Sequence, residues 1–95
     1  MSREKYPDMD FLENEMSDFI ISIIKGIVYE PDEAHIQNVT IEDGHAIFYL
    51  KVNRIDRANV IGLSGAMVKA INKIARMKTY INRKSIPCIV TIVDI

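Results

Sequence analysis

The chain has little of what holds small secreted domains together. Its 95 residues include one cysteine, three prolines and no tryptophan. The single cysteine, Cys88, cannot form an internal disulfide or a multi-cysteine metal site, which excludes a disulfide-stapled scaffold and a zinc ribbon. With 4 glycines, 48% hydrophobic and 26% charged residues, the chain is neither collagen-like nor of low complexity. The composition predicts one small globular domain in a reducing compartment.

Long hydrophobic runs are also absent. The densest apolar stretch, residues 19–24, contains Ser22 and is followed by Lys25, whereas a membrane-spanning helix needs about 18 or more apolar residues. Residues 1–8 carry acids where a signal peptide would carry its apolar core. We therefore expect no membrane partner and a cytoplasmic location.

The two halves of the chain carry opposite charge. Residues 1–50 hold 3 basic and 11 acidic side chains, a net charge of −8, whereas residues 51–95 hold 9 basic and 2 acidic ones, a net charge of +7. The total of −1 hides this separation. A basic half favours a face that binds a polyanion, and the alternative is that the charges are self-complementary or simply solvated.

The sequence of the N-terminal part predicts a flexible arm followed by a helix. Residues 1–15 lack an apolar period and are expected to form a flexible acidic N-terminal arm, followed by a domain over residues 16–95. From Met16 the apolar side chains recur at the spacing of an amphipathic helix, which Pro31 ends by about Tyr29.

The rest of the chain predicts three strands and two more helices. The expected strands are residues 34–41, 45–52 and 88–93, and the expected helices are residues 55–61, with Asn53 as a cap, and 66–81. The Glu42-Asp43-Gly44 turn predicts an antiparallel hairpin, and the helical crossover is long enough to make the last strand parallel. The fold class is therefore α+β, a two-layer sandwich with a three-stranded mixed sheet in the order α-β-β-α-α-β.

The long helix over residues 66–81 has two different faces. Apolar residues share one face, which is typical of the core-facing side of an amphipathic helix; they are Met67, Ala70, Ile71, Ile74, Met77 and Ile81. A basic stripe follows another face and consists of Lys69, Lys73 and Arg76, with Tyr80 at its end.

Two glycines, Gly62 and Gly65, join the two predicted helices through Gly62-Leu63-Ser64-Gly65. Without Cβ atoms at these positions, a phosphodiester backbone can approach the main-chain amides. The amides and the positive dipole end of the helix that follows also favour an anion. The alternative interpretation is a tight corner between two helices, and the spacing alone leaves both open.

These residues resemble a known family. The segment from Asn53 to Gly65, followed by Lys69-Ala70-Ile71, resembles the Ile-Gly-x-x-Gly core of a KH domain, and the helix-first order is similar to the type II form. With Glu30-Pro31-Asp32-Glu33 and Ile92-Val93-Asp94, residues 16–95 resemble the small bacterial single-KH RNA-binding proteins of the KhpA group. The resemblance implies that a loop clamps about four nucleotides of single-stranded RNA. It also implies an RNA chaperone that forms a homodimer or a heterodimer with another KH-containing protein.

The resemblance also implies which residues contact RNA. Gly62 and Gly65 would let the RNA backbone approach, whereas Leu63 and Ser64 form the variable pair in which family members often carry a lysine that this chain lacks. The remaining expected contacts are cations at Arg57, Lys69, Lys73 and Arg76, an apolar floor of Val60, Ile61 and Val68, and a flanking loop with Arg83 and Lys84. Val60 and Ile61 are equally compatible with plain core positions.

Catalytic and metal-binding patterns are not found. His35 and His45 could face each other across the hairpin, but no third ligand is near in sequence, so a structural or solvated role is favoured. The sequence contains no Walker A loop, nucleophile elbow or Cys/His pair. We therefore expect a non-enzymatic RNA-binding protein without cofactor or metal. The alternative is a KH-fold protein interaction adaptor with weak or lost RNA binding, because the Leu63-Ser64 pair carries no cation and the first half is acidic.

Overall fold

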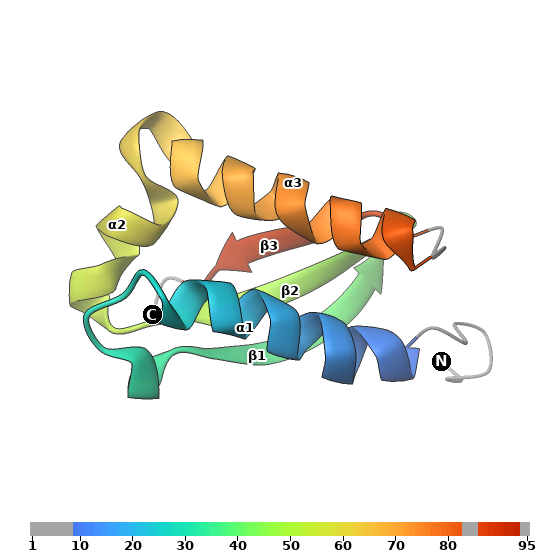
Figure 1. The fold of residues 1–95 in the computed structure, drawn as a ribbon, viewed down its shortest axis with the longest axis horizontal. Helices are drawn as coiled ribbons and strands as arrows, with labels where there is room; N and C mark the ends of the chain where they lie inside the picture. Colours follow the sequence, from blue (N-terminus) through green and yellow to red (C-terminus); the bar gives the residue numbers. More distant parts are fainter. Residues whose placement is uncertain (1–8, 83–85, 94–95) are drawn as a thin grey trace.

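The elements follow one another in the predicted order, helix-strand-strand-helix-helix-strand (Figure 1). The structure, a computed structural model, describes residues 9–82 and 86–93. The helices are α1 (Ser17–Lys25), α2 (Arg57–Ile61) and α3 (Ala66–Ile81), and the strands are β1 (His35–Glu42), β2 (His45–Lys51) and β3 (Cys88–Ile92). The predicted α+β class is confirmed.

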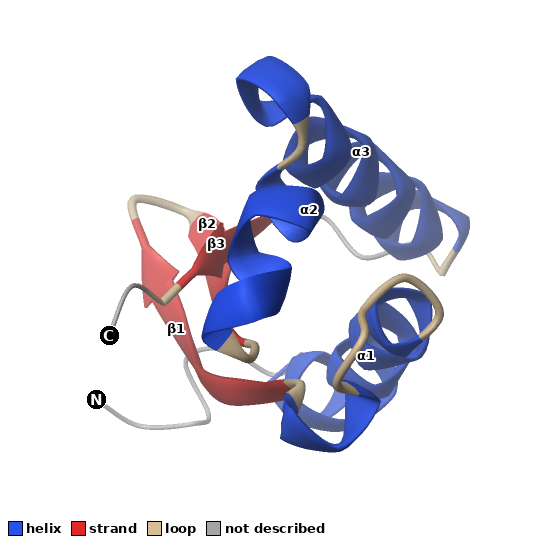
Figure 2. Ribbon diagram, turned by 90° about the vertical axis from the view of Figure 1, so that its left-hand side faces the viewer, coloured by secondary structure: helices blue, strands red, loops and turns tan. Residues whose placement is uncertain are grey.

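The three strands of the described chain form a mixed sheet in the order β1-β2-β3. β1 and β2 are antiparallel, and β2 and β3 are parallel. Asp43 and Gly44, with φ angles of 51° and 77°, make the tight turn of the hairpin. The register pairs His45 with Glu42 and places His35 at the other end, so the two histidines do not face each other. Helices α1 and α3 lie on the same side of the sheet, which gives two layers (Figure 2).

The core lies between this sheet and the helices. Ala46, Phe48 and Leu50 of β2 have no exposed surface, and the residues between them are half-buried, as expected for a strand with one covered face. The helices and β3 contribute further fully or nearly fully buried side chains, namely Leu12, Met16, Ile20, Ile24, Val60, Ile71, Ala75, Cys88 and Val90. Removal of this apolar surface from water is the main stabilising contribution to the fold.

The first helix begins earlier than predicted. Residues 9 and 10 are already helical, and a π-helical segment, Phe11–Met16, runs directly into α1. Leu12 has no exposed surface and extends the buried line of Met16 and Ile20 by four residues. Exposed acids between these positions hid the apolar period in the sequence. Residues 1–8 of the expected arm lie outside the described residues.

The buried side of α3 also differs from the predicted one. Its buried positions are Ile71, Ala75 and Thr79, spaced by four, and only Ile71 belongs to the predicted apolar face. The exposed fractions of the other large apolar side chains are 38% at Met67, 44% at Ile74, 57% at Met77 and 72% at Ile81. The small side chains of Ala75 and Thr79 are compatible with close packing on the sheet, and the larger apolar residues lie on the sides of α3 next to this buried line.

A buried carboxylate fixes the connection between α1 and β1. Asp56 has no exposed surface and accepts hydrogen bonds from the amides of Tyr29, at 2.7 Å, and Glu30, at 3.0 Å. Nearby, Asn53 accepts from the amide of Ile55 at 2.9 Å, which confirms its predicted capping role. The two bonds of Asp56 hold the turn after α1 against the start of α2.

We expect Asp56→Ala to lower the free energy of unfolding by about 3 kcal/mol, because two amides lose their acceptor in a buried site. Asp56→Asn keeps one acceptor oxygen and should lose roughly half as much. Urea unfolding followed by circular dichroism measures both values. If Asp56→Ala is as stable as the wild type, the carboxylate does not fix this connection.

Candidate functional site

The loop between α2 and α3 makes a tight turn through left-handed backbone conformations. Gly62 has φ 77° and ψ 173°, Ser64 has φ 54° and Gly65 has φ 76°. The amide of Gly65 donates to the carbonyl of Gly62 at 3.1 Å. Positive φ angles favour glycine, so the backbone itself explains both glycines in part.

The two glycines differ in what surrounds them. A Cβ atom at Gly62 would lie 2.7 Å from both the Cβ and the amide nitrogen of Met67, so this position must be glycine for α2 and α3 to meet. A Cβ atom at Gly65 would meet only the Cε of Lys69, at 3.9 Å. Gly62 therefore supports the interpretation of the loop as a tight corner between two helices. Gly65 supports the other interpretation, because the open space beside it leaves room for a phosphodiester backbone.

The open side of the loop has features that suit an anion. Gly65 caps α3 without a side chain, so no side chain of the cap residue bonds to the amides of the first turn. The 16-residue helix places its positive dipole end at this point. Lys69 lies one turn further along α3, and Leu63 at the loop tip is 89% exposed.

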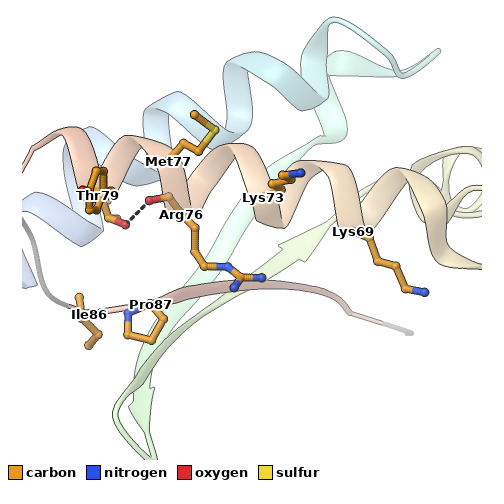
Figure 3. Close-up of a pocket in the computed structure, with 8 residues that line it drawn as sticks. Lys69, Lys73, Arg76, Met77, Thr79, Ile86 and Pro87 are labelled. Atoms are coloured by element: carbon orange, nitrogen blue, oxygen red, sulfur yellow. Dashed lines mark hydrogen bonds between the residues drawn. The ribbon is translucent and has the colours of Figure 1, made fainter.

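A groove of about 580 Å³ runs beside α3, on the side of the residues that lead into β3 (Figure 3). Lys69, Lys73, Arg76 and Tyr80, the predicted stripe, line it together with Met77, Thr79, Ile86 and Pro87. Arg76 reaches from α3 toward β3, and Ile86 and Pro87 lie across from the helix (Figure 3). The hydroxyl of Thr79 donates to the carbonyl of Arg76 at 2.7 Å and is thereby satisfied within the helix. Among the described lining residues there are three cations and no acid. We call this the basic groove.

A second groove lies on the other side of α3, between α3 and α1. It has a volume of about 370 Å³ and is lined by Phe19, Ile74, Met77, Lys78, Ile81 and Asn82. The amine of Lys78 lies 3.2 Å from a carboxylate oxygen of Glu15 and 5.0 Å from the centre of the Phe19 ring. The only described cation of its lining therefore already has an acidic partner, and the surface is mainly apolar. We call this the apolar groove.

The remaining predicted site residues occupy different environments. Val60 has no exposed surface and belongs to the core, so it is not available for direct contact. Ile61 is 40% exposed, whereas Val68 and Arg57 are half-buried. None of these three residues lines the basic groove. The predicted Arg83 and Lys84 lie outside the described residues.

Sequence reasoning missed some of the residues that shape these surfaces. Ile86 and Pro87 are separated from the basic stripe in sequence, and only the return of the chain into β3 brings them to α3. The apolar groove was missed because Ile74 and Ile81 were assigned to the core-facing side of the helix. Their spacing is that of one helix face, so the sequence carried no signal that separates them from core positions.

Other chemistry is not supported within the described residues. They contain no group of three or more histidine, cysteine, aspartate or glutamate side chains able to hold a metal ion. Cys88 is buried, which raises the pKa of its thiol to about 11 and keeps it protonated at neutral pH. None of the described helices has the length and apolar character that crossing a membrane requires.

Comparison with known proteins places the chain in a family. No family model matches it. The RNA-binding protein KhpA of Chlamydia caviae is 42% identical over 57 residues, which correspond to 59% of this chain and 70% of the relative. With this identity over more than two thirds of the relative, the chain belongs to the KhpA family.

Proposed function

We propose that this protein is a non-enzymatic RNA-binding protein that holds a short single-stranded segment at the Gly62–Gly65 loop and in the basic groove. The proposal rests on the fact that the Gly62–Gly65 loop and the basic groove are continuous. The open space at Gly65 is bounded by Lys69, which also lines the basic groove. A backbone of phosphates can therefore pass from the loop amides to a row of cations. Its family relative is named an RNA-binding protein.

The domain is proposed to be a KH domain of type II. The support is the order of elements and the position of the glycine loop between α2 and α3. KH domains clamp about four nucleotides of single-stranded RNA with such a loop. From the same resemblance we propose a cytoplasmic RNA chaperone role.

The proposed contacts divide into phosphate contacts and base contacts. Phosphates would meet the amides at the start of α3 and the side chains of Lys69, Lys73 and Arg76. Because Leu63 and Ser64 carry no charge, Lys69 takes the part of the missing loop cation. Bases would lie against the exposed part of Ile61. Arg57, Val68, Arg83 and Lys84 are proposed as flanking contacts.

We expect Gly65→Asp to weaken RNA binding at least tenfold, because a carboxylate in the open space repels phosphate and pairs with Lys69. Gly65→Asn is the matched control, since it has the same shape and no charge. Both side chains are favourable at a helix cap and tolerate the left-handed region, so both variants should fold. Fluorescence anisotropy with a labelled RNA gives the affinities. Equal affinities of the two variants would contradict phosphate approach at this loop.

We expect Lys69→Ala, Lys73→Ala and Arg76→Ala each to weaken binding of all RNA sequences by a similar factor. Each should also reduce the slope of log affinity against log salt by about one, since each removes one phosphate contact. Lys25→Ala, at an exposed position outside the basic groove, removes the same charge and should leave the slope unchanged. A changed sequence preference with an unchanged slope would identify base contacts instead.

A second function, protein interaction, is favoured by the apolar groove and by the 89% exposed Leu63. We propose that the apolar groove pairs with a second copy of the chain or with another KH-containing protein. Exposed apolar surface of this kind gains free energy when a partner removes it from water. In the alternative adaptor function, this pairing remains and RNA binding is weak or lost.

We expect Ile74→Glu to shift the protein toward the monomer by at least tenfold in the dissociation constant, because it places a carboxylate in the apolar groove that a partner would have to strip of water. Ile55→Glu is the control, since Ile55 is 61% exposed and lines neither groove. Sedimentation equilibrium measures the association of both variants and of the wild type. Equal association of the two variants would contradict pairing through this groove.

A further inference from the structure

The far end of the basic groove carries an exposed aromatic ring. Tyr80 is 83% exposed and lies one helical turn beyond Arg76, on the same side of α3. Ile86 and Pro87 line the same part of the molecule from the segment that leads into β3. This end of the groove thus combines the ring of Tyr80, the apolar side chains of Ile86 and Pro87, and the guanidinium of Arg76.

This end is distant from the glycine loop. From Ala66 to Tyr80 the helix rises about 21 Å, at about 1.5 Å per residue. Nucleotides whose phosphates contact the loop amides at the start of α3 therefore lie at the other end of the helix from Tyr80. The basic groove begins beside the loop at Lys69 and continues along α3 to Tyr80, so its lining offers contacts beyond the phosphates at the loop.

We infer that Tyr80 is a stacking platform for an RNA base outside the nucleotides held by the loop. The base would lie between the tyrosine ring and the wall of Ile86 and Pro87, while its phosphate passes Arg76. This inference rests on the proposed function and extends it, because it gives the RNA a defined path along α3 toward its C-terminal end.

The positive charge of the basic groove favours RNA over a protein as its ligand. Its described lining has Lys69, Lys73 and Arg76 without an acid, which complements a row of phosphates. Bases stack on aromatic side chains with little dependence on sequence, because every base has a π face. The apolar groove, whose cation is already paired with Glu15, has the composition that suits a protein partner instead.

The test compares RNA of two lengths. We expect Tyr80→Ala to weaken binding of a ten-nucleotide RNA about tenfold, as the loss of one base stack implies, and to change binding of a four-nucleotide RNA less than twofold. Tyr80→Phe keeps the ring and should bind both RNAs like the wild type. Tyr29→Ala is the matched control, since Tyr29 is 75% exposed and lines neither groove. The high exposure of Tyr80 means that these variants should fold, and urea unfolding verifies it.

A spectroscopic readout tests contact with the ring independently of affinity. The protein has 4 tyrosines and no tryptophan, so tyrosine emission is observed directly. The ten-nucleotide RNA should quench part of this emission in the wild type. Tyr80→Phe should lack that part of the quenching while binding with unchanged affinity.

The outcomes separate this inference from the proposed function. If the wild type binds neither RNA, the proposed function fails and the inference fails with it. If the wild type binds the ten-nucleotide RNA and Tyr80→Ala binds it as well as Tyr29→Ala does, only the stacking platform is overturned. An equal loss for both RNA lengths would assign Tyr80 to the loop-bound nucleotides and would also overturn the extended path.

Discussion

Helix α3 packs against the sheet through one buried side, and this contact sets which of its residues line the two grooves. Ile71, Ala75 and Thr79 form the buried line of the helix. The side chain of Asn72 accepts a hydrogen bond from the amide of Val90 at 2.5 Å, on the strand at the edge of the sheet. This bond satisfies a backbone donor at the edge and fixes both the rotation and the position of α3 relative to β3.

Two surfaces of different chemistry follow from this rotation. On one side of α3 the cations face the segment that leads into β3, and on the other side Ile74 and Ile81 face α1. Met77 lines both grooves. Lys78 is the cation that falls on the apolar side, and Glu15 pairs with it. One helix thus separates a surface suited to phosphates from a surface suited to a protein, and among the described lining residues the two surfaces share only Met77.

The sequence predicted what depends on local periodicity and turn chemistry. The order of elements, the Gly44 turn and the Asn53 cap followed from such signals. Tertiary packing decided the rest. Which side of α3 is buried depends on its approach to the sheet, and the different roles of Gly62 and Gly65 depend on the position of Met67. The start of the first helix was hidden because the exposed acids Glu13 and Glu15 lie between its buried residues Leu12 and Met16.

Chemical-shift mapping would locate the proposed RNA contact on the basic side of α3 residue by residue. Uniformly labelled protein would be titrated with a ten-nucleotide single-stranded RNA at low salt. We expect amide shifts to concentrate at residues 62–69 and around Arg76, Tyr80 and Cys88, with little change at Phe19 and Ile74. Shifts concentrated between α1 and α3, or on the sheet face that faces away from the helices, would contradict it.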